Sequence, residues 1–352
     1  MGLNDILIEA VNRNASDIHM CVGLPPVYRV NGELLCVETA VLGIEQCEKF
    51  VRDCISTESL PQLEQKGQAD FSYRIPGVAR FRVNAFKQRN TLALAFRVIS
   101  TEIPPISKLG LPEVILNLAE KQRGLVLVTG PTGSGKSTTL ASMVDYINTN
   151  FKHHIITIED PIEYLHKHKN CVINQREINQ DTNSYSDALR AALREDPDVI
   201  LIGEMRDQET IATALTAAET GHLVFSTLHT LGSAKTIDRI IDVFPPHQQS
   251  QVRSQLSTVL QGIVSQQLMR KQDGSGRVVA TEVMIMTPAI ANLIREARTS
   301  MINSCIHTGT DVGMHSMDSC IARLYKEKVI SYDSARQYSI DPENLNKLIR
   351  IN

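Results

Sequence analysis

The sequence predicts an α/β protein with a parallel-sheet core and a smaller α+β unit before it. From about residue 108 onward, short apolar segments of strand character alternate with helical patterns, which is typical of a parallel sheet covered by helices. Before about residue 100, one helical segment is followed by segments that alternate apolar and polar residues, as half-buried strands do. At 352 residues the chain is long enough for two domains.

The smaller unit begins with a helix and ends in a sheet. Residues 5–14 place their apolar side chains on one helix face. Residues 80–86 and 92–96 alternate apolar and polar positions after the turn signal Pro76-Gly77, which predicts strands. Residues 100–107 combine two prolines with polar residues, as interdomain linkers do. We therefore predict a first domain, a linker and a second domain at residues 1–100, 101–108 and 109–352.

The second domain is predicted from four apolar segments with the length of buried strands. They lie at residues 125–129, 154–158, 199–203 and 223–227. The helical pattern at residues 209–220 has Asp207 as a possible N-cap and ends at Gly221. After Pro245-Pro246 the pattern is mostly helical, so we expect a helical C-terminal part.

A glycine-rich loop connects the first of these strands to a helix. It reads Gly130-Pro-Thr-Gly-Ser-Gly-Lys-Ser137, and residues 138–144 after it favour a helix. In this context backbone N–H groups close around phosphate oxygens at a helix N-terminus, and side chains at the glycine positions would prevent it. Lys136 would supply charge to the β- and γ-phosphates and Ser137 a hydroxyl to Mg²⁺. The predicted site for ATP and Mg²⁺ consists of Gly130, Pro131, Thr132, Gly133, Ser134, Gly135, Lys136, Ser137 and Thr138.

Acidic side chains follow two further strands, and ligands of open parallel sheets lie at the carboxyl ends of strands. Glu159, Asp160 and Glu163 come after the second strand, and Glu204 follows the third. Glu204 has the position of a Walker B acid, which predicts a metal-binding role. We favour Glu163 as the catalytic base, because Pro161 ends the strand and lets the chain turn back over the site. For each of these acids a plainer alternative is that it caps a helix or is solvated.

Two histidines flank the fourth strand. His222 precedes it and His229 follows it, so we expect them at opposite ends of the strand. This geometry predicts that His229 senses the γ-phosphate, whereas His222, next to Gly221, is equally compatible with pairing to a helix C-terminus. A purely structural role stays open for both.

A small basic face is predicted in the first domain. Arg80 and Arg82 are two residues apart on one strand and therefore share a face, and Arg97 ends the neighbouring strand. One interpretation is a solvated sheet surface. The second is that these arginines reach the nucleotide of a neighbouring subunit, as arginine fingers do in trans.

Composition limits the range of functions. The 36 Lys and Arg against 39 Asp and Glu give a net charge of −3, so we expect no nucleic-acid partner. The 7 cysteines form no Cys-x-x-Cys pair, which indicates neither zinc nor a disulfide framework. No segment approaches the ~18 apolar residues of a membrane helix, so we expect a cytoplasmic protein without direct membrane insertion.

The ordered motifs of the chain resemble those of the type IV pilus and type II secretion ATPases, and within them the PilT-like retraction motors. Nearly the whole chain takes part. The motifs are Ala15-Ser-Asp-Ile-His19, Arg80-Phe-Arg-Val-Asn-Ala-Phe86, the Walker A loop, the Asp box Thr157–Glu163, the Walker B motif Leu201–Asp207 and the His box Thr220–His229.

The resemblance implies a PAS-like N-terminal domain, a RecA-like core and a homohexamer whose ATP lies between the core of one chain and the N-terminal domain of the next. It implies that Arg80, Arg82 and Arg97 act as arginine fingers and that His222 and His229 both have functional roles. The Asp-box glutamate aligns with Glu163, while Glu159 stays an alternative.

Subfamily features favour retraction. Assembly and secretion motors usually carry an extra N-terminal domain and a four-cysteine zinc insertion, and we expect neither here. Retraction motors carry Ala-Ile-Arg-Asn-Leu-Ile-Arg-Glu, which residues 289–296 match except for alanine at 291. Their apolar positions Ile290, Leu293 and Ile294 should pack on the core. Asn292, Arg295 and Glu296 would then face a partner.

The resemblance implies an ATP-hydrolysing motor for pilus retraction that works on an inner-membrane platform protein. We expect it in the cytoplasm, peripheral at the inner face of the cell membrane. The main alternative is a pilus-assembly or type II secretion ATPase of the same family. A nucleotide-gated scaffold is disfavoured by the intact Lys136, Glu163 and Glu204, and a DNA translocase is disfavoured by the balanced charge.

Overall fold

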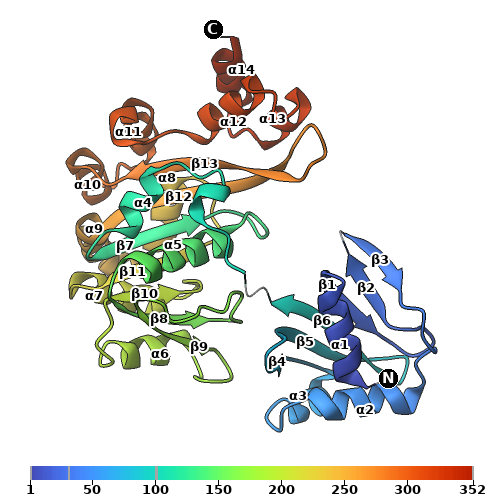
Figure 1. Cartoon of the computed structure of the whole chain (residues 1–352). Helices are drawn as coiled ribbons and strands as arrows, with labels where there is room; N and C mark the ends of the chain where they lie inside the picture. Colours follow the sequence, from blue (N-terminus) through green and yellow to red (C-terminus); the bar gives the residue numbers. More distant parts are fainter. Residues whose placement is uncertain (1, 31, 100–101, 351–352) are drawn as a thin grey trace. The chain divides into compact units, whose positions relative to one another are not determined.

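The computed structural model describes residues 2–30, 32–99 and 102–350 and divides into two compact units (Figure 1). The first unit comprises residues up to Glu102 together with Glu163–Leu165, and the second comprises Ile103–Ile162 and the residues from His166 onward. The predicted boundary residues 1, 100, 101 and 352 lie outside the described residues.

The first unit is one sheet of six strands in the order β3-β2-β1-β6-β5-β4, with all neighbours antiparallel. Its strands are β1 (Ala15–Met20), β2 (Val27–Val30), β3 (Glu33–Cys36), β4 (Gln68–Ile75), β5 (Ala79–Gln88) and β6 (Thr91–Ile99). Its helices are α1 (Leu3–Asn12), α2 (Ile44–Cys54) and α3 (Leu60–Lys66). The predicted helix at 5–14 and the strands at 80–86 and 92–96 are confirmed within a few residues.

Only one face of this sheet is buried. Ile18, Phe81 and Phe96 share a core with apolar residues of α1, α2 and α3. Because side chains alternate along a strand, the residues between them lie on the opposite face. That face carries Arg82 and Arg97. Both arginines are exposed, whereas the apolar residues next to them in sequence are buried or half-buried.

The second unit contains a sheet of seven strands in the order β13-β12-β7-β11-β10-β8-β9. The strands are β7 (Gly124–Thr129), β8 (His154–Glu159), β9 (Val172–Glu177), β10 (Val199–Ile202), β11 (Leu223–Leu228), β12 (Leu260–Arg270) and β13 (Arg277–Ile285). All neighbouring pairs from β12 to β9 are parallel, which confirms the predicted parallel sheet. The carboxyl ends of β7, β11, β10 and β8 therefore meet at one edge.

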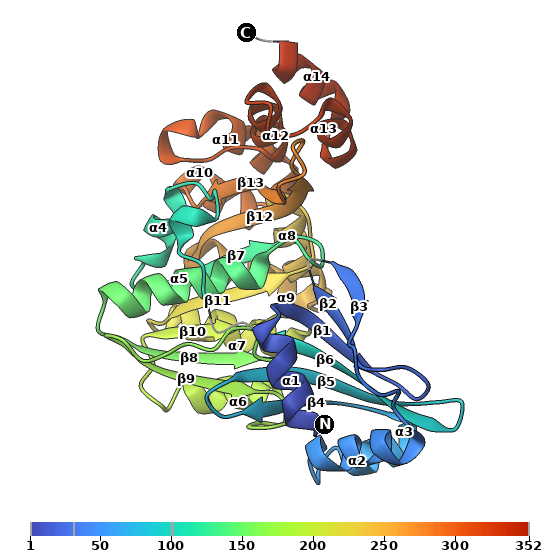
Figure 2. The ribbon, with the colours of Figure 1, turned by 45° about the vertical axis from the view of Figure 1, so that its right-hand side comes forward.

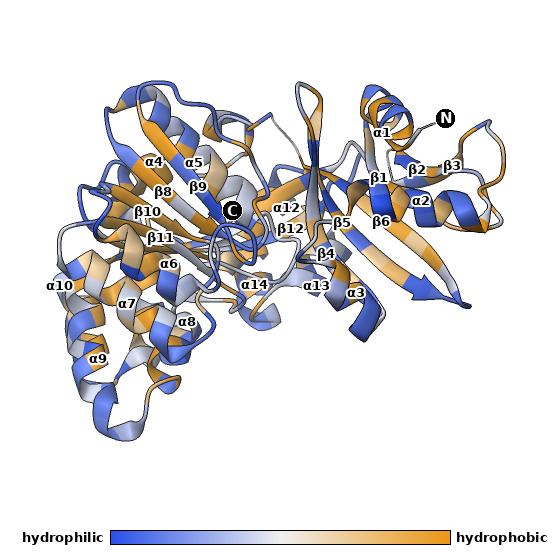
Figure 3. Ribbon diagram, turned by 90° about the horizontal axis from the view of Figure 1, so that it is seen from below, coloured by the Kyte–Doolittle hydropathy of each residue, from blue (hydrophilic) through white to orange (hydrophobic). Residues whose placement is uncertain are grey.

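Helices cover both faces of this sheet (Figures 2 and 3). On one face α4 (Val114–Ala119) and α5 (Lys136–Asn150) pack on β7, β11 and β12. The opposite face carries α6 (Tyr185–Ala192), α7 (Gln208–Glu219), α8 (Ser233–Asp242), α9 (Pro246–Val259) and α10 (Pro288–Arg295). The predicted N-cap of α7 is confirmed, because the Asp207 side chain accepts a hydrogen bond from the N–H of Thr210.

The prediction of a mostly helical C-terminal part was wrong for residues 260–285. Here β12 and β13 form a long antiparallel hairpin, and β12 also pairs with β7 in parallel. β12 is buried on both faces, and its sequence mixes apolar and polar residues without the strict alternation that would have distinguished a strand from a helix. The remaining helices are α11 (Ile302–Thr308), α12 (Met317–Lys326), α13 (Tyr332–Tyr338) and α14 (Pro342–Arg350), with short 3₁₀ turns at Ile106–Lys108, Thr299–Met301 and Thr310–Val312.

The segment that departs from the retraction motif forms α10. Ile290 and Ile294 are fully buried and Leu293 packs on the same core, as predicted. Ala291 is 7% exposed, so the departure from the motif lies on the buried side of the helix. Among the residues that the structure describes, no helix has both the length and the apolar character needed to cross a membrane.

Candidate functional site

The glycine-rich loop lies between the carboxyl end of β7 and the first turn of α5. All three of its glycines have positive φ, which is 139° at Gly130. A Cβ at this residue would lie 2.3 Å from the carbonyl oxygen of Gln266 and 2.7 Å from Oγ of Ser134. Gly130 is therefore required by close packing against β12, a reason that the sequence did not indicate.

Lys136 is the first residue of α5 and is only 8% exposed. Its Nζ donates to the carbonyl oxygens of Gly130 and Pro131, at 2.8 and 3.1 Å. The ammonium group is thus held against the loop itself. Ser137 and Thr138 follow in the same helical turn and are half-buried. The structure therefore brings the predicted loop residues together at a helix N-terminus, where an anion is favoured.

Gln266 supports the loop from β12, and sequence analysis missed it. The side-chain amide of Gln266 donates to Oγ1 of Thr139 at 2.9 Å, and the backbone carbonyl group of Gln266 faces Gly130. The side chain is fully buried. A polar residue in a segment predicted as helical gave no signal of this contact, which joins residues 127 positions apart.

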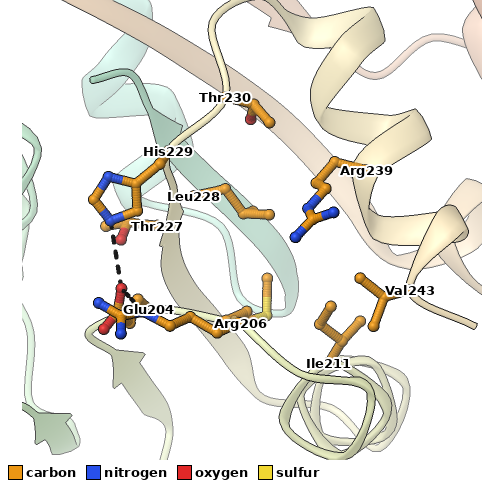
Figure 4. Close-up of a pocket in the computed structure, with 10 residues that line it drawn as sticks. Glu204, Arg206, Ile211, Thr227, Leu228, His229, Thr230, Arg239 and Val243 are labelled. Atoms are coloured by element: carbon orange, nitrogen blue, oxygen red, sulfur yellow. Dashed lines mark ion pairs between the residues drawn. The ribbon is translucent and has the colours of Figure 1, made fainter. Parts of the chain in front are cut away.

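Glu204 and His229 meet at the ends of β10 and β11 (Figure 4). Nε2 of His229 lies 3.4 Å from Oε2 of Glu204, and Nε of Arg206 lies 2.7 Å from the same oxygen. The Glu204 side chain is 15% exposed, whereas that of Arg206 is 74% exposed. The structure brings Glu204 and His229 together at the strand ends where they were expected, and their direct contact and that with Arg206 were not predicted.

A cavity of about 400 Å³ adjoins this pair. Its wall combines apolar side chains, among them Ile211 of α7 and Leu228 of β11, with threonine side chains, and Arg239 extends into it from α8 (Figure 4). Arg206 is turned toward Glu204, and Arg239 points toward the middle of the cavity. Two guanidinium groups, those of Arg206 and Arg239, therefore line the cavity next to Glu204.

Glu159 lies at the end of β8, where Oε1 accepts hydrogen bonds from Thr157 at 2.7 Å and Gln175 at 3.3 Å. The hydroxyl of Tyr185 lies next to it, because a Cβ on Gly203 would be 3.0 Å from that hydroxyl and 3.4 Å from Cα of Glu159. Burial raises the pKa of Tyr185, and the negative charges of Glu204, Asp160 and Glu159 raise it further. Tyr185 is thus a neutral hydroxyl among carboxylates, and sequence analysis missed it.

Glu163 differs from Glu159 and Glu204 because it belongs to the first unit. As predicted, β8 ends before Pro161, and Glu163 is exposed beyond it. Its role as catalytic base stays a prediction.

His222 lies at the amino end of β11, and His229 at the carboxyl end, as predicted. Nδ1 of His222 lies 3.0 Å from the carbonyl oxygen of Ala217 and 3.2 Å from Oγ1 of Thr220. His222 therefore pairs with the C-terminal turn of α7, at the edge of the sheet opposite to the phosphate loop. Its functional role, which the resemblance implies, stays a prediction.

The three predicted arginines lie on the exposed face of the first unit's sheet. Arg82 and Arg97 are directly opposite each other in β5 and β6. Nη2 of Arg80 donates to Oγ of Ser72 at 2.8 Å, and Nε of Arg97 donates to Oδ1 of Asp17 at 2.8 Å. The shared basic face is confirmed, and its relation to a neighbouring subunit stays a prediction.

A second cavity, of about 330 Å³, opens beside the phosphate loop. Its lining combines loop and α5 residues with Leu109, Leu268 and Arg277. The lining combines leucine and valine side chains with hydroxyl groups, an amide and one guanidinium, and such a mixed cavity next to a phosphate site fits a nucleotide base. The sequence gave no signal for it, because its residues come from four separate segments.

The site also has the donors that a magnesium–nucleotide complex needs. Among the described residues, Oγ of Ser134 and Oγ1 of Thr129 are buried without a hydrogen-bond partner, and both lie at the phosphate loop. A buried hydroxyl without a partner is costly unless a ligand satisfies it. Ser137 and Glu204 supply the oxygen atoms that Mg²⁺ prefers. The residues present therefore fit both the phosphates and the metal.

Comparisons with known proteins agree with this site. Residues 2–323 match the family model described as "Type II/IV secretion system protein". The chain is 50% identical to the type IV pilus retraction ATPase PilT of Pseudomonas aeruginosa over 98% of its own length and 100% of that protein. It is 48% identical to a twitching motility protein of Neisseria gonorrhoeae, covering 91% of this chain and 86% of that one.

A solved structure is also similar over almost the whole chain. The crystal structure of the pilus retraction motor PilT with bound ADP has a TM-score of 0.92 and 50% sequence identity, and the match covers 99% of both chains. The phosphate loop and the strand-end residues all lie within residues 2–323, the part of the chain that matches the family model. The chain belongs to the type II/IV secretion system protein family.

Proposed function

We propose that this protein is an ATP-hydrolysing motor that powers type IV pilus retraction. The observation that carries the proposal is the identity of 50% with PilT over 98% of this chain and 100% of that protein. In this chain the phosphate loop is intact, and Glu204 and His229 lie together at the neighbouring strand ends. A protein with these features binds ATP and hydrolyses it.

Catalysis by this chain depends on positioning and electrostatics, as in phosphoryl transfer generally. The loop amides and Lys136 hold the β- and γ-phosphates, and the positive charge stabilises the negative charge that develops during transfer. Mg²⁺, when bound, would neutralise part of the negative charge of the phosphates, and Ser137 and Glu204 are the residues that would hold it. Glu163 orients and deprotonates the attacking water, with Glu159 as the alternative. His229 contacts Glu204 and is placed to respond to the γ-phosphate.

The motor works as an oligomer, a homohexamer, in which Arg80, Arg82 and Arg97 of one chain approach the phosphates bound by the next. Their exposed, shared face supports this arrangement, because arginines of this kind stabilise transferred phosphate in trans. Residues 1–100 and 109–352 act as separate domains joined by the linker 101–108, and their relative motion is the mechanical output.

The partner on which this output acts is a pilus platform protein at the inner membrane. The motor is therefore cytoplasmic and peripheral at the inner face of the membrane. The charge of −3 supports the absence of a nucleic-acid partner.

A deletion and complementation experiment tests the function. Deletion of the gene is expected to leave extra surface pili and abolish twitching, and wild-type protein restores both phenotypes. Lys136→Ala keeps the fold but loses the charge on the phosphates, so it is expected to abolish phosphate release and fail to complement. Loss of pili after the deletion would instead indicate an assembly motor, and a wild-type ATPase rate in Lys136→Ala would contradict the assigned site.

A further inference from the structure

The exposed face of the first unit's sheet carries a row of polar side chains that runs across five strands. In the register of the sheet, Arg29 of β2, Asp17 of β1, Arg97 of β6, Arg82 of β5 and Ser72 of β4 are successive neighbours. Residues paired in register point to the same face. One carboxylate therefore lies in a row with three guanidinium groups.

Asp17 contacts the arginines on both sides of it. Nε of Arg97 donates to Oδ1 at 2.8 Å, and Nε of Arg29 lies 3.8 Å from Oδ2. The Asp17 side chain is 16% exposed, whereas that of Arg97 is 69% exposed. Arg29 is itself fixed, because its Nη1 donates to the carbonyl oxygen of Gly32 at 2.9 Å. The carboxylate is thus an inner anchor from which Arg97 extends into solvent.

The charge state of Asp17 is suited to this role. Burial alone would raise the pKa of Asp17, but the hydrogen bonds from Arg97 and Ser16 and the positive charge of Arg97 outweigh it, so the pKa lies below its usual range. The group is ionised at neutral pH. Its charge reduces the repulsion among the three arginines of the row.

The contact also fixes how Arg97 is presented. An arginine side chain has many rotamers, and ordering it on binding costs conformational entropy. An ion pair that already orders the side chain before binding lowers this cost. In Arg97 the Nε–H is directed to Asp17, and with 69% of the side chain exposed the terminal amino groups keep N–H donors that are accessible from solvent. Those groups are the ones that bind phosphate oxygens in pairs.

We propose that Asp17 is a positioning residue for the arginines that act on the nucleotide of a neighbouring copy. It holds Arg97 with terminal N–H donors accessible from solvent, and Arg29 supports the carboxylate from the other side. This inference rests on the proposed function, in which Arg97 contacts phosphate in trans. Asp17 itself does not touch the nucleotide.

A double-mutant cycle between Asp17 and Arg97 tests the proposal. Asp17→Asn is expected to lower kcat roughly 10- to 100-fold, the effect of a misplaced catalytic group, with a smaller change in the KM for ATP. Arg97→Ala is expected to lower kcat at least as far. Adding Asp17→Asn to Arg97→Ala should then lower kcat no further, because the group that Asp17 positions is already missing. Effects that multiply in the double variant would overturn the proposal.

The single variants distinguish this inference from the proposed function. A wild-type kcat in Arg97→Ala overturns the role of Arg97 in trans and, with it, the role of Asp17. A slow Arg97→Ala with a wild-type Asp17→Asn overturns the role of Asp17 alone. Asp70→Asn is the matched control, because Asp70 lies on the same sheet face, opposite Asn84, and outside the arginine row. It is expected to keep the wild-type kcat.

A further variant separates positioning from charge and from folding. Asp17→Glu keeps the negative charge but moves the carboxylate by about one methylene, ~1.5 Å. It is expected to retain the wild-type Tm and still to lower kcat. A wild-type kcat in Asp17→Glu would overturn positioning in favour of charge neutralisation. A fall in kcat that is restored by lowering the temperature below a reduced Tm would overturn it in favour of a structural role.

Discussion

Lys136 and Arg97 carry the same charge and are proposed to act on the same phosphates, yet the chain holds them in different ways. Lys136 is buried, and its ammonium group donates to two carbonyl oxygens of its own loop. Arg97 is 69% exposed and is held by one side-chain ion pair. The ammonium group of Lys136 is therefore held by the backbone of its own loop, which β12 supports from one side, whereas the arginine face depends on side chains of several strands. The first lies within one chain, and the second is proposed to act on a neighbouring copy.

The largest effect on the ATPase rate is expected from removing an arginine of the exposed face. Arg82→Ala should lower the ATPase rate by roughly 10³-fold or more, because an arginine finger in trans has an effect of that size. Dilution to the monomer should remove activity for the same reason, and this is measured by phosphate release alongside light scattering. Mixing Lys136→Ala with Arg82→Ala chains should not restore a full set of sites.

The control for this prediction is Arg52→Ala, which removes an exposed arginine from α2 in the same unit. It should leave the rate unchanged. Full activity in a demonstrated monomer would contradict the requirement for a neighbouring arginine.

The next effect separates carboxylates of the two units. Glu163→Gln should slow hydrolysis by roughly 10²- to 10⁴-fold while ATP still binds, because a general base is lost and the phosphate loop is intact. Glu204→Gln should in addition change the Mg²⁺ dependence, since Glu204 is a proposed metal ligand. Steady-state rates over a Mg²⁺ titration, together with nucleotide binding, measure both effects. If Glu159→Gln is slow and Glu163→Gln is normal, Glu159 is the base.

The same contrast explains how much of the molecule could be predicted from sequence. The phosphate loop, the parallel strands and the N-cap of α7 depend on residues close together in the chain, so local pattern predicted them. The strand-end rule also brought Glu204 and His229 together. Each of these features follows either from residues that are neighbours in sequence or from the rule that parallel strands place their carboxyl ends at one edge.

The features that were missed depend on residues far apart in the chain. Asp17 was in a recognised motif, but its partner Arg97 is 80 residues away. Gln266 contacts the phosphate loop from β12, a strand whose sequence lacks the apolar–polar alternation that would have predicted it. Tyr185 matters because Gly203 leaves room for its hydroxyl. Periodicity along one segment carries no information about such contacts.

A smaller effect on hydrolysis is expected at α10, which lies outside both halves of the comparison. Asn292 and Arg295 are exposed on α10, whereas Ile290 and Ile294 hold the helix in the core. Replacing Asn292 and Arg295 together with alanine should leave the ATPase rate within about twofold, since surface changes away from a site have small effects. Pilus retraction should fail if these residues contact a partner. Retraction at the wild-type level would make α10 purely structural, and loss of both activities would contradict a coupling role.

The smallest expected effect is on the pH dependence of the free energy of unfolding. It comes from a largely buried histidine of the second unit and not from the exposed arginine face. His166 is largely buried, its Nδ1 has no partner among the described residues, and burial lowers its pKa from 6.5 to about 4. The nearby charge of Asp145 opposes this shift and that of Lys169 adds to it. Between these two pKa values the unfolded chain binds a proton and the folded chain does not. The free energy of unfolding should therefore fall as the pH falls from 6.5 toward 4, by at most about 1.4 kcal/mol per pH unit.

His166→Phe removes this proton and keeps a ring of similar size, so the loss of stability between about pH 7 and about pH 5 should be smaller in the variant than in the wild type. Urea unfolding of both proteins at the two pH values measures the difference. His247→Gln, at an exposed histidine of α9, is the control and should keep the wild-type pH dependence. Asp17 should contribute almost nothing to this slope, because its carboxyl group is ionised in the folded chain, where its pKa is lowered, and also in the unfolded chain above about pH 5. An unchanged slope in His166→Phe would mean that different groups cause the acid sensitivity of the second unit.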